Sequence, residues 1–275
     1  MILSRRWNRI GAVALFFALL ITIFPFLFTF LNSIKLFKDI IMGAWIFTPT
    51  LDNYDRLFFS KQSAFIVNTT NSFIVAIACM ILVVVIATLA AYSLERFHWP
   101  RWLTGLIAAW ILLFHMIPGA TIVGPFYLLF RSVGLYDTLP GLTLAHLVLN
   151  LPLGIWIVQG FVADLPIEME EAAHIDGCSN LGTFLRIVVP LIAPGLAAVA
   201  ILTFVFSWNE FMFALNLTSF KAATIPVGIA KFAQQYEVRY GEMSAAAFFA
   251  TIPAIIFLAV AQRQIVKGLT LGALK

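Results

Sequence analysis

Charged residues are scarce in this sequence: Asp, Glu, Lys and Arg make up 11% of 275 residues, against about a quarter in an average soluble domain. Apolar residues make up 62%. A chain with so few polar groups cannot cover the surface of a water-soluble globule. The composition therefore excludes a soluble domain and predicts a protein whose solvent is lipid.

Cysteine and the common catalytic motifs are also scarce or missing. Cys79 lies in an apolar run and Cys178 in a polar segment, so neither a disulfide framework nor a metal site is predicted. The sequence lacks the patterns GxxxxGK[ST], HExxH and GxSxG, so it has no P-loop for ATP and no cofactor is expected on this chain. The net charge of +4 is dispersed, which gives no case for nucleic-acid binding.

Long apolar runs are abundant. About 20 apolar residues are needed for a helix to cross the hydrocarbon core of a bilayer. Six runs meet this criterion, at residues 10–31, 65–92, 102–130, 139–161, 191–215 and 245–266. They lack the two-residue alternation of barrel strands. The predicted fold class is an all-α polytopic membrane protein with six transmembrane helices in a single domain over residues 1–275.

The first run could be mistaken for a signal peptide, and the third contains a proline. Residues 11–31 carry no charge over 21 positions and no convincing small-residue cleavage site follows, so we interpret them as a retained span rather than a signal peptide. The third run contains Pro118 and is long enough to kink there. Arg5, Arg6 and Arg9 crowd the first run, which favours a cytoplasmic N-terminus. Six spans then place both termini in the cytoplasm, and residues 162–190 with them.

Residues 162–190 form a polar, acid-rich segment between apolar runs. Asp164 is expected to cap a first short helix. Gly177 is expected to end that helix in a left-handed turn. Ser179 is expected to cap a second helix that continues to Val188. The prediction is two short helices bent at Gly177.

The end of this segment has a distinctive spacing. Residues 171–190 read Glu-Ala-Ala, three residues, Gly177, nine residues, and then Ile-x-Val-Pro. This spacing resembles the EAA loop of importer-type ABC transporter permeases, the membrane subunits that a separate ATPase drives. The family pattern ends Ile-x-Leu-Pro, so Val189 is the one departure.

The resemblance extends over most of the chain. The segments LDNY at 51–54, AYSLERF at 91–97, WNEF at 208–211 and QRQIVKGLTLGA at 262–273 are similar to the carbohydrate-importing branch of that family. This branch includes the smaller membrane subunit of maltose importers and subunits for trehalose, glycerol phosphate and polyols.

The resemblance implies that the loop docks in a groove of the ATPase and transmits its closing motion. The implied coupling residues are Glu171, Ala172, Ala173, Asp176, Gly177 and Pro190. Glu171 is the expected polar anchor and Gly177 the expected pivot. The alternative for the same segment is an ordinary amphipathic linker with solvated acids.

The resemblance also implies a bacterial inner-membrane complex. Its other parts would be a second permease subunit of similar fold, two copies of an ABC ATPase that hold ATP and magnesium, and an external solute-binding protein. The chain itself would be no enzyme. Its function would be to translocate a carbohydrate or polyol by alternating access, although the particular sugar does not follow from the sequence.

Two other classes of function stay open. An ion- or proton-coupled secondary transporter would need a relay of ionisable groups within the spans. An intramembrane enzyme would need paired carboxylates or a nucleophile beside a base, and the sequence shows no such arrangement.

Candidates for a substrate path come from polar and aromatic residues inside the spans. Glu210 is the only acidic residue within them, and a charge there should face protein or a water-filled path. Such a path would combine the Glu210 carboxylate and the Asn209 amide, for sugar hydroxyls, with the Trp208 indole, for the apolar face of a sugar. The alternative for Glu210 is a hydrogen bond that joins helices.

Three further polar residues lie within the predicted spans. His115 and His146 lie in the third and fourth spans, and Asn150 in the fourth. His115 and Asn150 are retained as candidates for the path. For each of the three, internal packing and hydrogen bonding is the alternative.

Overall fold

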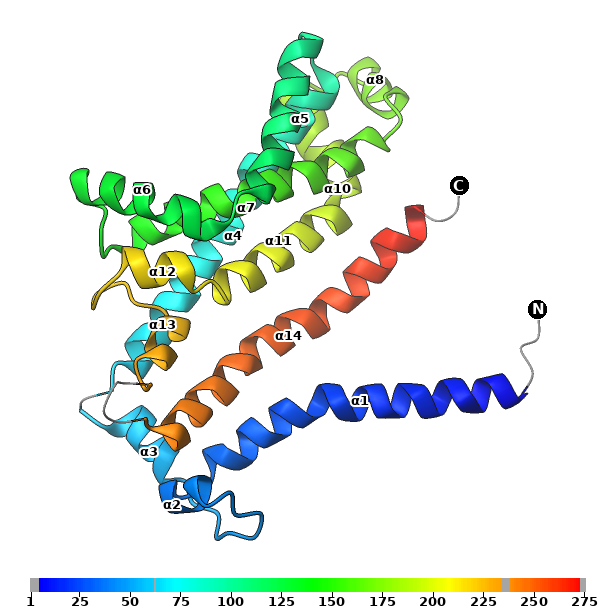
Figure 1. Cartoon of the computed structure of the whole chain (residues 1–275). Coiled ribbons are helices and arrows are strands. Elements are labelled where there is room, and N and C mark those ends of the chain that lie inside the picture. Colours follow the sequence, from blue (N-terminus) through cyan, green and yellow to red (C-terminus); the bar gives the residue numbers. More distant parts are fainter. Residues whose placement is uncertain (1–4, 62, 234–237, 273–275) are drawn as a thin grey trace. The chain divides into compact units, whose positions relative to one another are not determined.

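A computed structural model of the chain describes residues 5–61, 63–233 and 238–272. Its regular structure is helical, apart from a single bridge between Ala233 and Val238 (Figure 1). The chain divides into two compact units, one of residues 1–66 and 228–252 and the other of residues 67–227 and 253–275. Each unit has its own packing.

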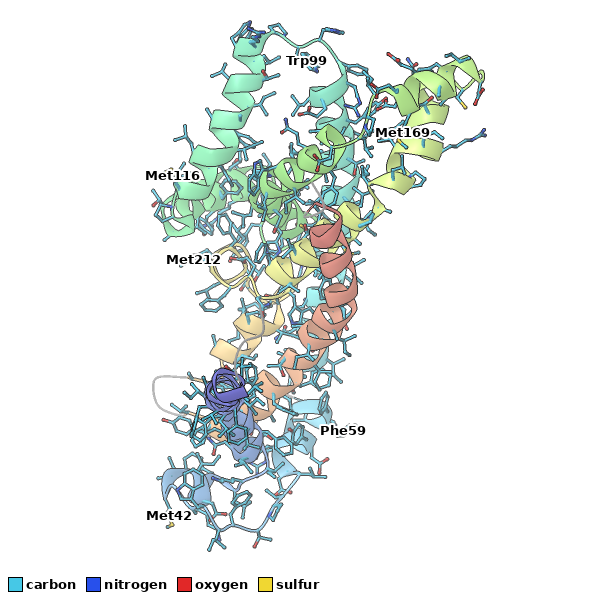
Figure 2. The ribbon with its side chains drawn as sticks, turned by 90° about the vertical axis from the view of Figure 1, so that its right-hand side faces the viewer. Met42, Phe59, Trp99, Met116, Met169 and Met212 are labelled. Carbon is cyan, nitrogen blue, oxygen red and sulfur yellow. The ribbon has the colours of Figure 1, made fainter. Side chains whose placement is uncertain are left out.

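The first unit contains α1 (Arg5–Ser33), α2 (Phe37–Ile41), α3 (Asp52–Phe59) and the beginning of α14 (Tyr240–Gly272). The apolar stretch Gly11–Ser33 is long enough to cross a membrane, and none of its most apolar window is buried within the chain. Side chains that stand out from this unit, such as Met42 and Phe59, are visible in Figure 2. The unit therefore exposes apolar surface suited to lipid or to another membrane chain.

The LDNY segment closes the end of α1. The Nδ2 of Asn53 donates to the carbonyl oxygens of Ser33 (2.9 Å) and Lys35 (2.8 Å). The hydroxyls of Tyr54 and Ser33 lie 2.8 Å apart. A helix leaves its last carbonyls without intrahelical partners. The side-chain amide of Asn53 supplies hydrogen-bond donors to such carbonyls at the end of α1. A side chain at Gly241 would overlap the amide of Asn53, which shows how closely the start of α14 packs here.

The second unit is built on α4 (Phe65–Arg96), α7 (Leu139–Ala163) and α11 (Ala193–Trp208). Buried side chains of all three helices form its main core, among them Val83, Val158 and Val199. Gly154 lies between the helices: a Cβ there would be 2.7 Å from Val83 Cγ1 and 3.4 Å from Val199 Cγ1. Small residues at such crossings let helix backbones approach closely.

The third predicted run is two helices rather than one kinked span. α5 (Arg101–Met116) ends before Pro118, and α6 (Gly119–Ser132) begins after it. Ile117 is extended, at φ −78° and ψ 120°, because a residue before proline is driven out of the α region. With 16 and 14 residues, each helix is shorter than the roughly 20 residues that cross a bilayer.

The fifth predicted run is also interrupted. α10 (Val189–Leu191) and α11 are separated at Ile192, where the helical pair Asn180–Leu191 and Ala193–Trp208 bends by 73°. α11 then ends at Trp208, and α12 (Met212–Leu217) follows. The remaining predicted runs correspond to single helices, with α14 longer than the predicted 245–266.

Span counts among the described residues follow from these breaks. Four helices are long and apolar enough to cross a membrane, or up to five if the bent pair is one span. A helical fold with several helices long and apolar enough to cross a membrane is therefore confirmed for the described residues. A total of six spans stays a prediction.

Candidate functional site

The segment between α7 and α11 contains the two short helices that the sequence predicts. α8 (Glu168–Ile175) comes first, and α9 (Asn180–Thr183) continues into the π-helix η1 (Phe184–Val188). Gly177 lies between them with φ +86°, in the left-handed region. The Ser179 hydroxyl caps α9 and accepts from the Gly182 amide at 3.2 Å. The bend at Gly177 and the cap at Ser179 are thus as predicted.

The predicted cap at Asp164 is wrong. α7 continues to Ala163, and Asp164 is its C-terminal cap, with its amide donating to the Gly160 carbonyl at 3.2 Å. α8 begins later, at Glu168, and has no side-chain cap. Sequence reasoning placed the helix boundary too early because the apolar run of α7 extends two residues beyond its predicted end.

Glu170 fastens this segment to the rest of the second unit. Its carboxylate accepts from the Nε of Arg96 and, at 2.7 Å, from the hydroxyl of Tyr92. The Nη2 of Arg96 also donates to the carbonyls of Val162 (3.1 Å) and Leu165 (2.9 Å). The side chains of Arg96 and Glu170 are 11% and 8% exposed, so this is a buried ion pair that joins α8 to the ends of α4 and α7.

Sequence reasoning did not single out this pair. The available signal was the AYSLERF segment, which places Tyr92 and Arg96 four residues apart on one face of α4. A tyrosine and an arginine on one helical face predict an acidic partner nearby. Several glutamates were candidates, and only the structure identifies Glu170.

The predicted coupling residues fall into two groups. Ala173 is buried and packs inside the chain. The others are exposed: Glu171, Ala172, Asp176, Gly177 and Pro190. The apolar side chains of Ile175 and Leu181 lie in the same segment, 87% and 66% exposed. Acidic groups and uncovered apolar groups thus share this surface.

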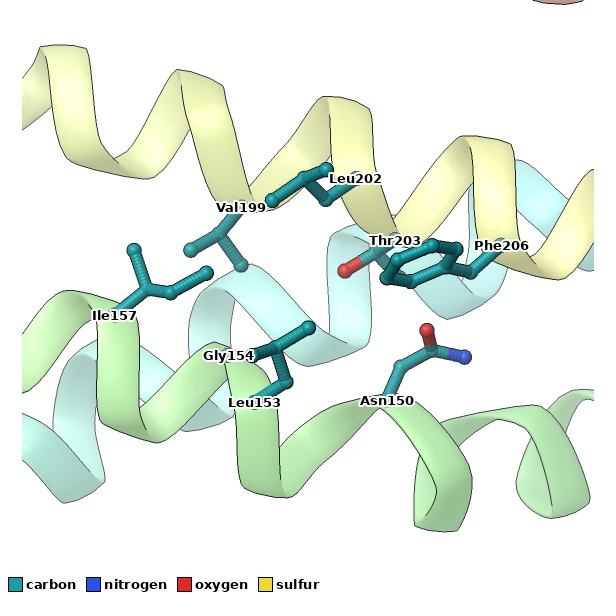
Figure 3. A pocket seen from close by; sticks show the side chains of 8 residues that line it. All are labelled: Asn150, Leu153, Gly154, Ile157, Val199, Leu202, Thr203 and Phe206. Carbon is teal, nitrogen blue, oxygen red and sulfur yellow. The ribbon is translucent and has the colours of Figure 1, made fainter. Parts of the chain in front are cut away.

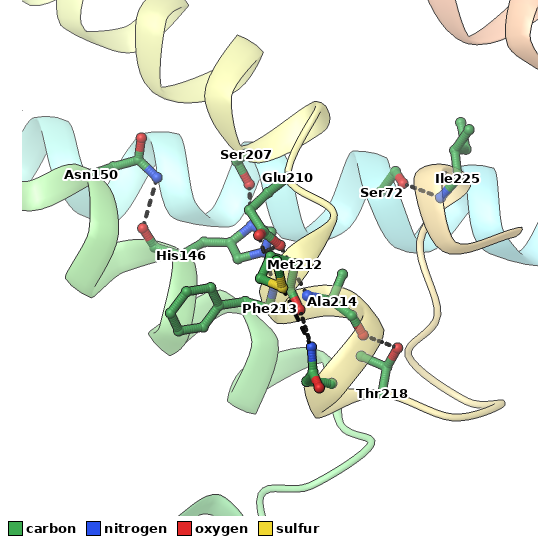
Figure 4. A network of polar contacts seen from close by, with 11 residues as sticks. Ser72, His146, Asn150, Ser207, Glu210, Met212, Phe213, Ala214, Thr218 and Ile225 are labelled. Atoms are coloured by element: carbon green, nitrogen blue, oxygen red, sulfur yellow. Dashed lines mark hydrogen bonds and ion pairs between the residues drawn. The ribbon is translucent and has the colours of Figure 1, made fainter. Parts of the chain in front are cut away.

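A second polar cluster joins α7, α11 and α12 (Figure 4). His146 is fully buried, with its Nδ1 2.7 Å from the Ser207 hydroxyl and its Nε2 3.2 Å from Oε2 of Glu210. The Glu210 carboxylate also accepts from the amides of Phe213 (2.8 Å) and Ala214 (2.9 Å). Glu210 therefore caps the beginning of α12 and ties it to His146. This arrangement matches the helix-joining alternative for Glu210.

The other substrate-path candidates are dispersed. Trp208 is buried, with its ring centroid 4.7 Å from that of Phe73 and 5.7 Å from that of Phe204. Asn209 is exposed and donates to the Val205 carbonyl at 2.9 Å. The side chain of His115 lies outside the described ones.

Asn150 lies where α7 faces α11. Its Nδ2 donates to the His146 carbonyl at 2.8 Å. With Thr203 and Phe206 it lines a crevice (Figure 3) too narrow to hold a water molecule. Asn150 and Glu210 both contact His146, so these two candidates lie in one hydrogen-bonded group.

Asp137 holds a third cluster, which the sequence did not suggest. Its carboxylate accepts from the backbone amides of residues 219–222 at 2.9–3.3 Å. On the other side of this loop, Asn71 donates to the carbonyls of Lys221 (2.8 Å) and Ala223 (2.9 Å). Burial acts to raise the pKa of Asp137, but the four amide donors outweigh it and hold the pKa below its ordinary value.

Metal ligands do not gather in the part of the chain that is described: no group of three or more His, Cys, Asp or Glu side chains there is placed to hold an ion. Cys79 and Cys178 are both free thiols. The three clusters above are networks of hydrogen bonds and ion pairs.

Residues 84–271 match the protein family described as "Binding-protein-dependent transport system inner membrane component". The chain is 37% identical to the trehalose transport system permease protein SugB of Mycobacterium tuberculosis (strain CDC 1551 / Oshkosh), over 98% of this chain and 97% of that one. It is 35% identical to the trehalose/maltose transport system permease protein MalG of Thermococcus litoralis, over 100% and 98%.

A solved structure of a bacterial ABC transporter for import of the acidic polysaccharide alginate has a similar fold. The TM-score is 0.77 and the sequence identity 21%, with 96% of this chain and 99% of that chain covered. The family match covers more than half of the chain, and both relatives are matched along nearly their whole length. This chain therefore belongs to the family of binding-protein-dependent transport system inner membrane components.

Proposed function

We propose that this chain is the membrane-spanning permease subunit of an ATP-driven importer for a carbohydrate or polyol. The support is the family match together with the two relatives, whose names specify trehalose and trehalose or maltose. A family that depends on a binding protein makes an external solute-binding protein the partner that delivers the substrate.

The coupling surface is the observation that carries the mechanism. Glu171, Asp176 and Gly177 are exposed on the α8–α9 segment, while Glu170, one residue away, anchors that segment to Arg96. A docking element needs both properties, because a free surface binds the motor and a rigid attachment passes its movement on. We assign this surface to a separate ABC ATPase, two copies of which hold ATP and magnesium.

The transport cycle follows from that arrangement. ATP closes the ATPase dimer, the docking segments move with it, and alternating access exposes a central path to one side of the membrane and then the other. We assign the chain six spans with both termini in the cytoplasm, which would put the docking segment on the ATPase side. A second permease subunit of similar fold would complete the path. Asn209, which is exposed, is the foremost candidate for contact with substrate, followed by Asn150, Trp208, Glu210 and His115.

A secondary transporter driven by ions or protons is not favoured. It would require ionisable groups free to exchange protons along a path. Glu210 contacts His146 and accepts from the first amides of α12, and His146 contacts Ser207 as well, which gives both of them an internal structural role.

Charge reversal on the docking surface tests the proposal. In the complex reconstituted with the ATPase, Glu171→Lys combined with Asp176→Lys should abolish copurification of the ATPase and reduce ATP-dependent uptake of labelled trehalose or maltose to background. Asp55→Lys, at an exposed acid on α3, is the matched control and should leave both unchanged. Normal uptake and copurification in the double variant would refute the coupling role.

A further inference from the structure

A cavity of about 520 Å³ lies within the unit of residues 1–66 and 228–252. It is formed around the end of α1 and the short helix α2 and has apolar, aromatic and polar walls. The lining residues that matter here are Asn32, Lys35, Ile41, Trp45 and Tyr240.

Lys35 is the charged group of this cavity. The residue is only 5% exposed. Its Nζ lies 4.8 Å from the ring centroid of Phe47 and 5.9 Å from that of Trp45. No carboxylate among the described residues forms an ion pair with it. Lys35 lines the cavity, and the two ring faces give its ammonium group only part of the stabilisation that an anion would give. An anion in the cavity would therefore be a favourable partner for it.

The surroundings of the cavity are those of a membrane interface. The apolar stretch Gly11–Ser33 ends two residues before Lys35, and its most apolar window has no burial within the chain. Large apolar side chains at the cavity and beside it are exposed: Trp45, which lines it, is 71% exposed, and Met42, labelled in Figure 2, is 78% exposed. Tryptophan and tyrosine gather at the level of lipid headgroups, where Trp45 and Tyr240 would then lie.

We propose that this cavity binds the phosphate group of an anionic phospholipid. Lys35 is the counter-ion, and the amide of Asn32 supplies a hydrogen-bond donor. The lipid's acyl chains follow the apolar surface of α1. Free phosphate shares the headgroup's chemistry, but it lacks the chains that the exposed apolar surface beside the cavity would hold.

Native mass spectrometry of the full chain in mixed micelles tests this site. Wild type should retain phosphatidylglycerol over phosphatidylcholine by roughly fivefold, the preference expected from one basic group at a headgroup. Lys35→Gln should lose the preference and Lys35→Arg should keep it. Lys38→Gln, which removes an exposed lysine three residues away, should also keep it.

Several outcomes would overturn the proposal. These are an undiminished preference in Lys35→Gln, an equal loss in Lys38→Gln, or displacement of the lipid by millimolar inorganic phosphate, which would identify a free anion as the ligand. If Lys35→Gln does not fold, Ile41→Glu places a repelling charge at an exposed position of the cavity wall. That variant should lose the preference, whereas Phe59→Glu, on exposed surface of α3, should not. Retention in Ile41→Glu would likewise refute the site.

Discussion

Glu170 and Glu171 are neighbours in sequence and opposites in environment. Successive residues of a helix point about 100° apart, so one side of α8 faces the protein and the next residue faces solvent. Glu170 is 6% exposed and pairs with Arg96, whereas Glu171 is exposed. The EAA spacing begins at Glu171 and indicated that residue as the polar anchor. The structure adds that Glu170, which lies outside the spacing, attaches the segment to Arg96.

Loss of the Glu170 charge should weaken the fold. Glu170→Gln leaves the guanidinium of Arg96 buried without a counter-ion, which typically costs about 3–5 kcal/mol. Denaturant unfolding in detergent, followed by tryptophan fluorescence, measures this loss.

The control for that experiment is Glu168→Gln on the same helix, at an exposed position, with an expected change within about 0.5 kcal/mol. A double variant, Arg96→Met with Glu170→Met, should recover most of the loss, since removing both charges leaves neither one unpaired. Equal stability of Glu170→Gln and Glu168→Gln would contradict the anchor role.

Helices show which parts of the fold a sequence can predict. Apolar runs that the structure leaves as one helix, such as those of α4 and, despite Pro152, of α7, were predicted with the right type and nearly the right ends. Breaks were harder. Pro118 indicated a kink, but the structure has a complete interruption there. The end of α11 had no proline signal at all, because the carboxylate of Glu210 creates it by capping α12.

The candidate site was predictable to a similar degree. The bend at Gly177 and the cap at Ser179 follow from local chemistry, which short sequence patterns contain. The pairing of Glu170 with Arg96 and of His146 with Glu210 joins residues 64–74 positions apart. Such pairs depend on how helices pack, and one sequence does not specify that packing.

Packing between helices can be tested at Gly154. Gly154→Ala places a methyl group 2.7 Å from Val83 Cγ1, and overpacking of this kind typically costs about 1–3 kcal/mol. Gly160→Ala, one to two turns further along α7, has nothing within 4 Å and should be neutral or slightly stabilising, because alanine favours a helix over glycine. Thermal unfolding of both variants gives the comparison, and equal midpoints would show that the three helices are not tightly packed.

At the scale of the whole molecule, long-range polar contacts add to the apolar core of the second unit. Asp137 binds amides 82–85 positions away, and so closes much of the second unit around one carboxylate. Its φ of 55° lies in a region that asparagine and aspartate tolerate better than other side chains. Asp137→Asn therefore removes the charge without adding backbone strain.

The lowered pKa of Asp137 predicts how stability depends on pH. A depressed carboxylate pKa stabilises the fold above the ordinary value of 3.8, and this contribution is lost as the pH falls through the lower folded-state value. Wild type should thus exceed Asp137→Asn in unfolding midpoint at pH 7, and the gap should shrink as the pH approaches 3. A gap that stays constant with pH would show that the charge does not contribute.

The π-helix at Phe184–Val188 has an evolutionary consequence. A π turn holds one more residue than an α turn, so it offsets the faces of the helices before and after it by about 100°. Deleting one codon here would rotate the exposed acids of α8 relative to α11. Homologous sequences should accordingly show many substitutions within residues 184–188 but no insertion or deletion there.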